Sequence, residues 1–159
     1  MDKARLRQAI IEKIRTELDN QTRAALLARD EATHEESKPE NKYDTHSQEA
    51  AYLAEGQARL AAELQESIAL YQSLTLPNLA AEQPITLGAV VTLEIAGRKL
   101  RYFLGPRNGG LEITCDGLDY IVITPQSPLG RQLLGKNAGE TLATQSAGRI
   151  VKQQILSVE

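Results

Sequence analysis

Acidic side chains gather in residues 30–55, which hold eight Asp or Glu residues and two lysines, for a formal charge of −6. Carboxylate oxygens suit hard cations, and a Mg²⁺ site typically uses one or two carboxylates together with waters. The same charge repels a nucleic-acid duplex. The segment therefore predicts a partner that brings metal ions or positive charge. A plain solvated surface is the competing interpretation, because charge-rich loops commonly have no other role.

Two other residue types could carry chemistry. His34 and His46 lie twelve positions apart and flank the bend expected at residues 36–44. Histidines and carboxylates together can bind a metal, but surface histidines at helix ends explain the spacing more simply. The single cysteine, Cys115, excludes an internal disulfide and indicates a reducing compartment. We expect it to be a small buried residue of a strand, because no base that would activate a thiol can be identified.

Long helices are predicted on both sides of the acidic segment. Residues 3–28 carry an apolar stripe at Leu6, Ile10, Ile14, Leu18 and Ala25, with Asp2 as an N-cap type. Residues 46–73 carry a stripe at 3–4 spacing, made of Ala50, Leu53, Gln57, Leu60, Leu64, Ser67 and Tyr71. Each stripe is narrow enough to need one partner, and the other helix is the nearest. At 1.5 Å rise per residue, an antiparallel hairpin about 40 Å long is expected.

The bend of this hairpin is predicted at residues 36–44. Pro39 removes a backbone donor and disfavours helix at Lys38. Asn41 and Asp44 are turn or N-cap types. The acidic segment, at about residues 30–45, is therefore expected to form the tip of the hairpin.

The pattern changes to short strands after a proline-containing stretch, LTLPNLAAEQP. We predict a hairpin domain at residues 1–74, a linker at 75–84 and a small β-rich domain at 85–159. The predicted strand pairs lie within residues 90–104, turning at Ala96–Gly97; at 111–114 and 118–124, turning at Asp116–Gly117; and at 140–145 and 149–158, turning at Ala147–Gly148.

One short helix is predicted inside the β-rich domain. Ser127 suits an N-cap and Pro128 the first helical position. Leu129, Leu133 and Leu134 would form its apolar side, and Gly135 would end it. The expected fold class is α+β: an antiparallel helical hairpin followed by a small β-rich domain with one helix.

Composition narrows the function classes. The chain has 159 residues, 42% of them hydrophobic, 25% charged and 4% aromatic, with no Trp. The scarcity of aromatics argues against a large aromatic-lined ligand pocket. No run approaches the ~18 apolar residues of a membrane span, and the first residues lack the apolar core of a signal peptide. We expect a cytoplasmic protein with no membrane partner and no sequence-specific reading of DNA.

Two stretches of the C-terminal half carry the more specific resemblance to a known family. GAVVTLEI (residues 88–95) and SPLGRQLLGKNAGE (residues 127–140) resemble a strand and the signature of the bacterial Gre transcription elongation factors (GreA/GreB), with Glu140 where that family usually has Asp. ESKPENKYDTHSQEAAYLAEGQ (residues 36–57) resembles the family's hairpin tip. Glu36 matches its leading acid, Glu40–Asn41 its Glu-Asn pair and Tyr43 its tyrosine.

The resemblance implies a coiled-coil hairpin joined to an FKBP-like domain, and RNA polymerase as the partner. The hairpin would enter the secondary channel of the polymerase, and the tip would help to hold a second Mg²⁺ and a water that cleave backtracked RNA. The chain would bind no cofactor stably alone, would not be an enzyme by itself and would meet the RNA 3′ end only indirectly. The tip residues given these roles are Glu36 and Glu40 for metal or water, Asp44 and Glu35 as substitutes, and Asn41 and Tyr43 for orienting water or RNA.

The same resemblance implies where the β-rich domain would meet the polymerase. The segment that would grip the rim of the channel consists of Ser127, Pro128, Leu129, Gly130 and Arg131. Taken without the resemblance, the Ser127–Pro128 pair is simply the start of a helix, and both interpretations can hold together.

The tip departs from the family pattern at three places. Pro39 is an extra residue between Lys38 and Glu40, one residue is missing between Asn41 and Tyr43, and Asp44 has no clear counterpart. These changes alter the geometry of the tip. The alternative function is therefore a secondary-channel regulator or inhibitor that does not promote cleavage.

Two rival classes remain. An FKBP-like domain suggests a peptidyl-prolyl isomerase, but that activity resembles work in an aromatic-lined pocket, and the aromatic candidates are only Tyr102, Phe103 and Tyr120. A plain coiled-coil interaction module fits the heptads but leaves the acids at the bend unexplained. A basic strand with Arg98, Lys99 and Arg101 suggests an acidic partner surface or, more simply, a solvated strand face.

Overall fold

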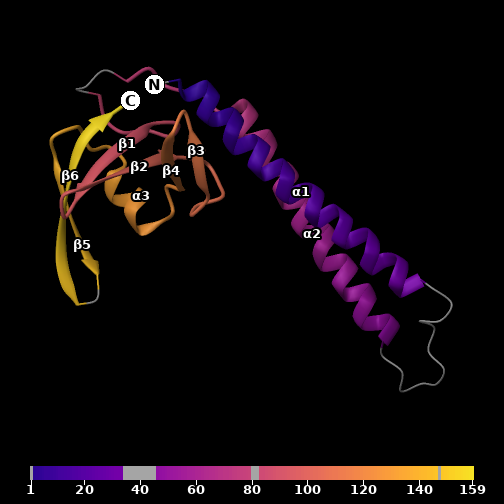
Figure 1. The fold of residues 1–159 in the computed structure, drawn as a ribbon. Coiled ribbons are helices and arrows are strands. Elements are labelled where there is room, and N and C mark those ends of the chain that lie inside the picture. Colours follow the sequence, from indigo (N-terminus) through magenta and orange to yellow (C-terminus); the bar gives the residue numbers. More distant parts are fainter. Residues whose placement is uncertain (1, 34–45, 80–82, 147) are drawn as a thin grey trace. The chain divides into compact units, whose positions relative to one another are not determined.

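The computed structural model of the chain describes residues 2–33, 46–79, 83–146 and 148–159. In these residues two long helices, α1 (Lys3–Thr33) and α2 (His46–Ser73), precede six strands and one short helix, α3 (Pro128–Leu133) (Figure 1). The predicted α+β fold class is confirmed. None of the described helices is long and apolar enough to cross a membrane.

Both long helices form where they were predicted. The bounds of α2 agree with the sequence pattern, whereas α1 continues five residues beyond the predicted end at residue 28, to Thr33. Asp2 caps α1, because its Oδ1 accepts hydrogen bonds from the N–H groups of Ala4 and Arg5 at 3.0 and 3.1 Å.

The chain divides into two compact units. One consists of Met1–Ile11 with Leu70–Glu159, and the other is Glu12–Ala69. The first eleven residues and the end of α2 thus belong with the sheet. The predicted domain boundaries, which place a hairpin domain at residues 1–74, a linker at 75–84 and a β-rich domain at 85–159, stay a prediction.

Within Glu12–Ala69, α1 and α2 run side by side (Figure 1). The predicted stripe of α2 is wrong at two positions, because Leu53 and Leu60 are 54% and 44% exposed. The 3–4 spacing fits two overlapping lines of residues, and the structure buries the one that contains Ala54 and Ala61 more deeply. A groove of about 490 Å³ follows this line between the two helices.

The strands form one sheet with the order β3-β4-β2-β1-β6-β5. All neighbouring strands are antiparallel except β2 and β4, which are parallel from Tyr102↔Ile121 onward. The strands are β1 (Val90–Ile95), β2 (Arg98–Leu104), β3 (Glu112–Cys115), β4 (Leu118–Ile123), β5 (Thr141–Ser146) and β6 (Arg149–Val158). The strand pairs expected from the sequence are therefore present.

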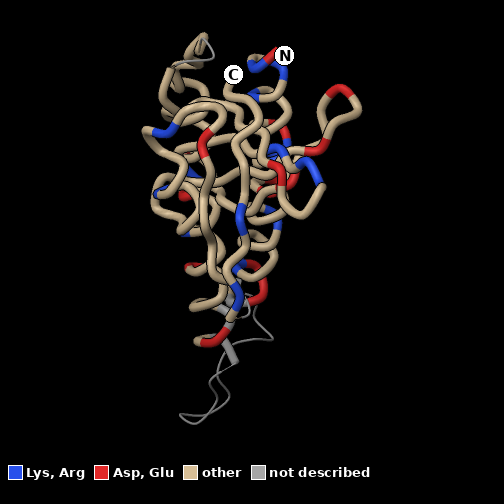
Figure 2. Tube along the Cα trace, turned by 90° about the vertical axis from the view of Figure 1, so that its left-hand side faces the viewer, with Lys and Arg blue, Asp and Glu red and all other residues tan. Residues whose placement is uncertain are grey.

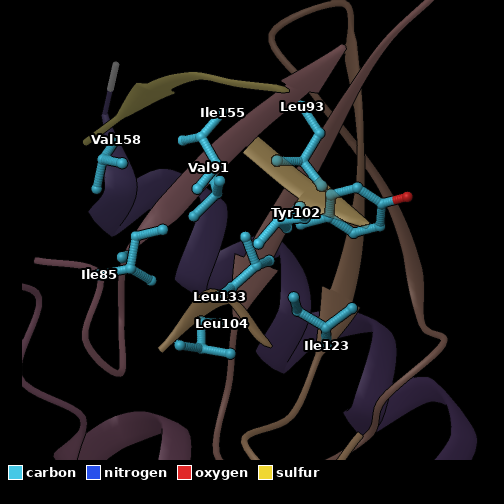
Figure 3. Close-up of a cluster of buried hydrophobic side chains, with 11 residues drawn as sticks. Ile85, Val91, Leu93, Tyr102, Leu104, Ile123, Leu133, Ile155 and Val158 are labelled. Atoms are coloured by element: carbon cyan, nitrogen blue, oxygen red, sulfur yellow. The ribbon is translucent and has the colours of Figure 1, made fainter. Parts of the chain in front are cut away.

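Each face of the sheet has buried side chains. On one face α3 places Leu133 against a core that includes Val91, Leu93, Leu104 and Ile155 (Figure 3). On the opposite face Phe103 stacks with Tyr71 at the end of α2, with ring centroids 6.4 Å apart. The base of α1 is fixed to the same unit, because Arg7 donates to the Leu74 carbonyl at 3.1 Å and Lys3 donates to the Pro77 carbonyl.

The β1–β2 turn carries an alanine in an unfavourable conformation. Ala96 and Gly97 have φ values of 49° and 77°, the pair of positive values that a type I′ hairpin turn needs. No neighbouring atom lies within 4 Å of a Cβ placed on Gly97. Backbone conformation alone should therefore decide the effect of a substitution there.

We expect Ala96→Gly to stabilise the protein and Gly97→Ala to destabilise it, each by about 1 kcal/mol, because a Cβ is disfavoured at positive φ. Urea denaturation of the two variants and the parent measures both changes. Equal stability of all three proteins would contradict the type I′ assignment.

Candidate functional site

The predicted tip lies outside the residues that the structure describes. Glu35, Glu36, Glu40, Asn41, Tyr43 and Asp44 all belong to this segment, as does His34, and the side chain of His46 is likewise not described. Their predicted roles therefore stay predictions. What the structure does give is the pair of helix ends, Thr33 and His46, that bound the segment.

Charges at these helix ends are only partly explained by helix stability. Glu49 lies in the first turn of α2, where the helix dipole favours an acid, and the last turn of α1 has no basic residue. Asp30 and Glu31 lie close to that end of α1. The helix dipole disfavours acids near a helix C-terminus, so it does not account for Asp30 and Glu31.

A metal ion held by this chain alone finds no support in the described residues. They contain no group of three or more His, Cys, Asp or Glu side chains that could hold a metal ion. The carboxylates of Glu36 and Glu40 have the right chemistry for Mg²⁺, which accepts one or two carboxylates and completes its shell with other oxygens. Both residues lie outside the described residues, so their role as ligands of a shared Mg²⁺ stays a prediction.

The second predicted site, at the start of α3, is fully described. Ser127 is the N-cap: its Oγ accepts from the Gly130 N–H at 3.0 Å and donates to the Thr124 carbonyl at 2.8 Å. Pro128 occupies the first turn, as predicted. Gly130 lies directly over the Thr124 carbonyl, and a Cβ placed on it would be 1.9 Å from that oxygen. Ser127 and Gly130 thus build the turn.

The remaining predicted partner residues differ in exposure. Pro128 and Arg131 are exposed, whereas Leu129 is half-buried against the core. Of the five predicted residues, Pro128 and Arg131 are therefore the exposed ones. The prediction that Leu134 belongs to the buried side of the helix is wrong: it is 39% exposed, because it is the C-cap and its ψ of 128° leaves the helix.

An exposed leucine that the sequence reasoning did not single out is Leu87, which is 36% exposed just before β1. It follows Ile85, whose backbone pairs with Gly135 and Lys136 after α3 at 2.9 and 2.8 Å. The sequence around Leu87 did not predict this backbone pairing, because Gly135, which pairs with Ile85, is 50 residues further along the chain.

Glu140, at the end of the signature, has a defined structural role. Its carboxylate accepts from the Asn137 N–H at 2.6 Å and from Lys136 Nζ at 3.2 Å. These two hydrogen bonds, the Asn137 one first, lower the pKa of Glu140. The longer side chain therefore closes the turn after α3 at a position where the Gre family usually has Asp.

Cys115 and the basic strand remain minor candidates. The prediction that Cys115 is buried is wrong, because it is half-exposed at the end of the four-residue strand β3. Desolvation and the neighbouring Asp116 raise the pKa of its thiol, which disfavours the nucleophilic thiolate. On β2, Lys99 is exposed and Arg101 half-buried, and both line a hollow of about 260 Å³ that also contains Asp119.

The aromatic side chains of the sheet are used for packing. Tyr102, Phe103 and Tyr120 are at most 8% exposed, so their rings do not offer the open walls that an isomerase pocket would need. Both basic and acidic residues occur along the chain of the sheet domain (Figure 2).

The fold defines the class of protein: an α+β chain with two long helices and a six-stranded sheet domain in the described residues. No protein-family model matches the sequence, and no curated protein matches it significantly.

Solved structures to which the chain is similar include Gfh1 of Thermus aquaticus, at 18% identity and a TM-score of 0.41, covering 95% of this chain and 94% of that one. Gfh1 (GreA factor homolog 1) of Thermus thermophilus gives 18% and 0.38, covering 94% of each chain. A GreA/GreB elongation factor of Nitrosomonas europaea gives 20% and 0.39, covering 65% of this chain and 78% of that one. TM-scores below 0.5 at these identities do not establish a shared family.

Proposed function

We propose that the protein binds RNA polymerase as a Gre-type transcription factor. In this proposal the hairpin enters the secondary channel, and the tip acids stimulate Mg²⁺-dependent cleavage of backtracked RNA. The protein would activate a reaction of the polymerase and would not be an enzyme alone.

The observation that carries the proposal is that one chain contains two sequence features together. The segment SPLGRQLLGKNAGE, which resembles the Gre signature, forms the capped helix α3 and the turn closed by Glu140. The same chain has two long helices whose ends bound a segment with four acids, Glu35, Glu36, Glu40 and Asp44. Neither an isomerase nor a plain interaction module accounts for both features.

The proposed chemistry divides between the two proteins. Glu36 and Glu40 would supply carboxylate oxygens to an ion whose other ligands belong to the polymerase, and Asn41 and Tyr43 would orient the water or the RNA end. A second Mg²⁺ so held stabilises the entering and leaving oxygens of the phosphodiester. The sheet domain would hold the hairpin in place through the exposed side chains at α3.

A second candidate function is favoured by the sequence of the tip. Pro39 and the shortened spacing between Asn41 and Tyr43 change the geometry of the acids relative to the Gre pattern. A tip that enters the channel without completing the metal site would slow the polymerase. This non-cleaving regulator shares the partner and the docking surface of the first proposal.

Binding to core RNA polymerase tests what both candidates share. The full chain, carrying an affinity tag, should retain purified core enzyme on a resin and should lose it when untagged protein is added in excess. Absence of any association at micromolar concentration would rule out both candidates.

Arg131→Glu is expected to weaken binding to core polymerase at least 10-fold, with a loss of stability of at most about 1 kcal/mol from the helix dipole. Arg131 is exposed in the last turn of α3, so a charge reversal costs little in the free protein but places a repulsive group in a docked interface. Lys152→Glu is the matched control, because it makes the same charge change at an exposed position on β6. Equal affinities of the two variants, measured by fluorescence anisotropy, would remove α3 from the docking surface.

A further inference from the structure

Strand β5 is the outermost strand of the sheet. It pairs only with β6, through six successive residue pairs from Thr141↔Gln154 to Ser146↔Arg149. Among the residues that the structure describes, no strand lies on its other side (Figure 1). An edge strand of this kind presents a row of backbone N–H and C=O groups to any further strand.

The β5 edge lacks the features that usually prevent such pairing. Thr141–Ser146 reads TLATQS, with no charge, proline or glycine, and its register with β6 has no bulge. A side-chain hydrogen bond also fixes β5 to its neighbour, since Gln153 of β6 donates to Thr144 Oγ1 at 2.7 Å. The opposite edge differs: β3 has four residues, including Glu112, and Asp116 in its turn pairs with Arg5 at 2.8 Å.

We propose that the β5 edge pairs with the β5 edge of a second copy of this chain, antiparallel and across a two-fold axis at Ala143. A free backbone edge selects an extended strand as its partner. An uncharged edge gives a charged peptide no electrostatic recognition, whereas two copies of it meet without like charges in register. The partner strand that these properties favour is therefore β5 of a second copy of this chain.

The side chains of β5 permit this register. If the two-fold axis is normal to the sheet, side chains on one face of β5 lie next to side chains on the same face of the second copy. Ala143 would lie opposite Ala143 of the second copy, and Thr141 opposite Gln145; all three residue types are exposed here and none is bulky and apolar. On the other face Leu142 is already buried by its own domain. The pairing would thus bury backbone polar groups without disturbing the core.

The expected association is weak, because only five residues of β5 per copy, Thr141 to Gln145, pair in this register, and such an interface is at the small end of the specific range. A dissociation constant on the order of 100 μM corresponds to that class. This inference does not depend on the proposed function, since it uses only the sheet domain.

Sedimentation equilibrium of the full chain from about 10 μM to about 1 mM tests the proposal, and a monomer–dimer equilibrium is expected in that range. Ala143→Lys should weaken dimerisation at least 10-fold by placing two lysines at the axis. Thr141→Lys with Gln145→Glu should keep or strengthen the dimer, because each Lys then faces a Glu. Thr141→Lys with Gln145→Lys should abolish it.

Three results would overturn the proposal. The first is a monomer at every concentration, and the second is an Ala143→Lys variant that dimerises like the parent, which would place the contact elsewhere. The third is equal loss of dimer in the two double variants, which would exclude the register. Far-UV circular dichroism and thermal denaturation establish that each variant is folded, and the two double variants remain informative if Ala143→Lys does not fold.

Discussion

Gly130→Ala is expected to destabilise the sheet domain by about 3 kcal/mol or more. In an open helix the same substitution would stabilise, because alanine has the higher helix propensity. At this position the new Cβ would lie 1.9 Å from the Thr124 carbonyl oxygen and 2.8 Å from its carbon. That oxygen also accepts from the Ser127 N–H and Oγ at 3.0 and 2.8 Å, so moving it disrupts the turn that begins α3.

Two variants serve as controls for this prediction. Gly56→Ala lies in α2 with no atom within 4 Å of the added Cβ, and it should raise stability by about 1 kcal/mol. Ser127→Ala removes only the cap and should cost about 1 kcal/mol. Urea denaturation measures all three. A Gly130→Ala variant as stable as the parent would mean that the carbonyl does not lie where the structure places it.

Gly105→Ala is expected to destabilise the protein by about 2–3 kcal/mol, and Tyr71→Phe should rescue part of that loss. A Cβ on Gly105 would lie 2.3 Å from the Tyr71 hydroxyl oxygen. Tyr71 is fully buried, and its hydroxyl donates to the Arg107 carbonyl at 2.7 Å. Burial raises the pKa of Tyr71, so the hydroxyl keeps the proton that it donates.

The four proteins of this pair form a double-mutant cycle. Tyr71→Phe alone should cost about 1 kcal/mol, the value of a buried hydrogen bond. The double variant should be more stable than Gly105→Ala, because its closest clash is gone and the next contacts, with Tyr71 Cζ and Val122 Cγ1, are at 3.1 Å. A favourable coupling of about 1–2 kcal/mol is expected. Additive free energies of unfolding would contradict this packing.

Features of this fold that depend on neighbouring residues could be predicted from the sequence. The Asp116–Gly117 turn, the Ser127 cap and the Asp2 cap each arise from residue types within a few positions, and the structure confirms them. The buried line of α2 was misassigned at Leu53 and Leu60, because 3–4 periodicity fits two lines that differ by one residue. Only the packing against α1 distinguishes them.

Long-range features gave no signal in the sequence. The contact of Tyr71 with Gly105 joins residues far apart in the chain, and the partial exposure of Cys115 follows from the position of β3 at the sheet edge. At the candidate site, the sequence predicted the turn at Ser127–Pro128 but not which members of the segment face outward. Arg131 is exposed while Gly130 is buried because the Thr124 carbonyl packs against Gly130.

The most direct test of the central claim uses stalled, backtracked transcription complexes with core RNA polymerase, Mg²⁺ and RNA labelled at its 5′ end. The full chain should shorten the RNA from its 3′ end, and Glu36→Ala/Glu40→Ala should lose at least 100-fold of this stimulation. Glu55→Ala/Glu63→Ala, which removes the same charge at exposed positions of α2, should retain it. Slower elongation without shortening by both parent and tip variant would favour the non-cleaving regulator. No shortening and no effect on elongation at saturating protein would contradict the account.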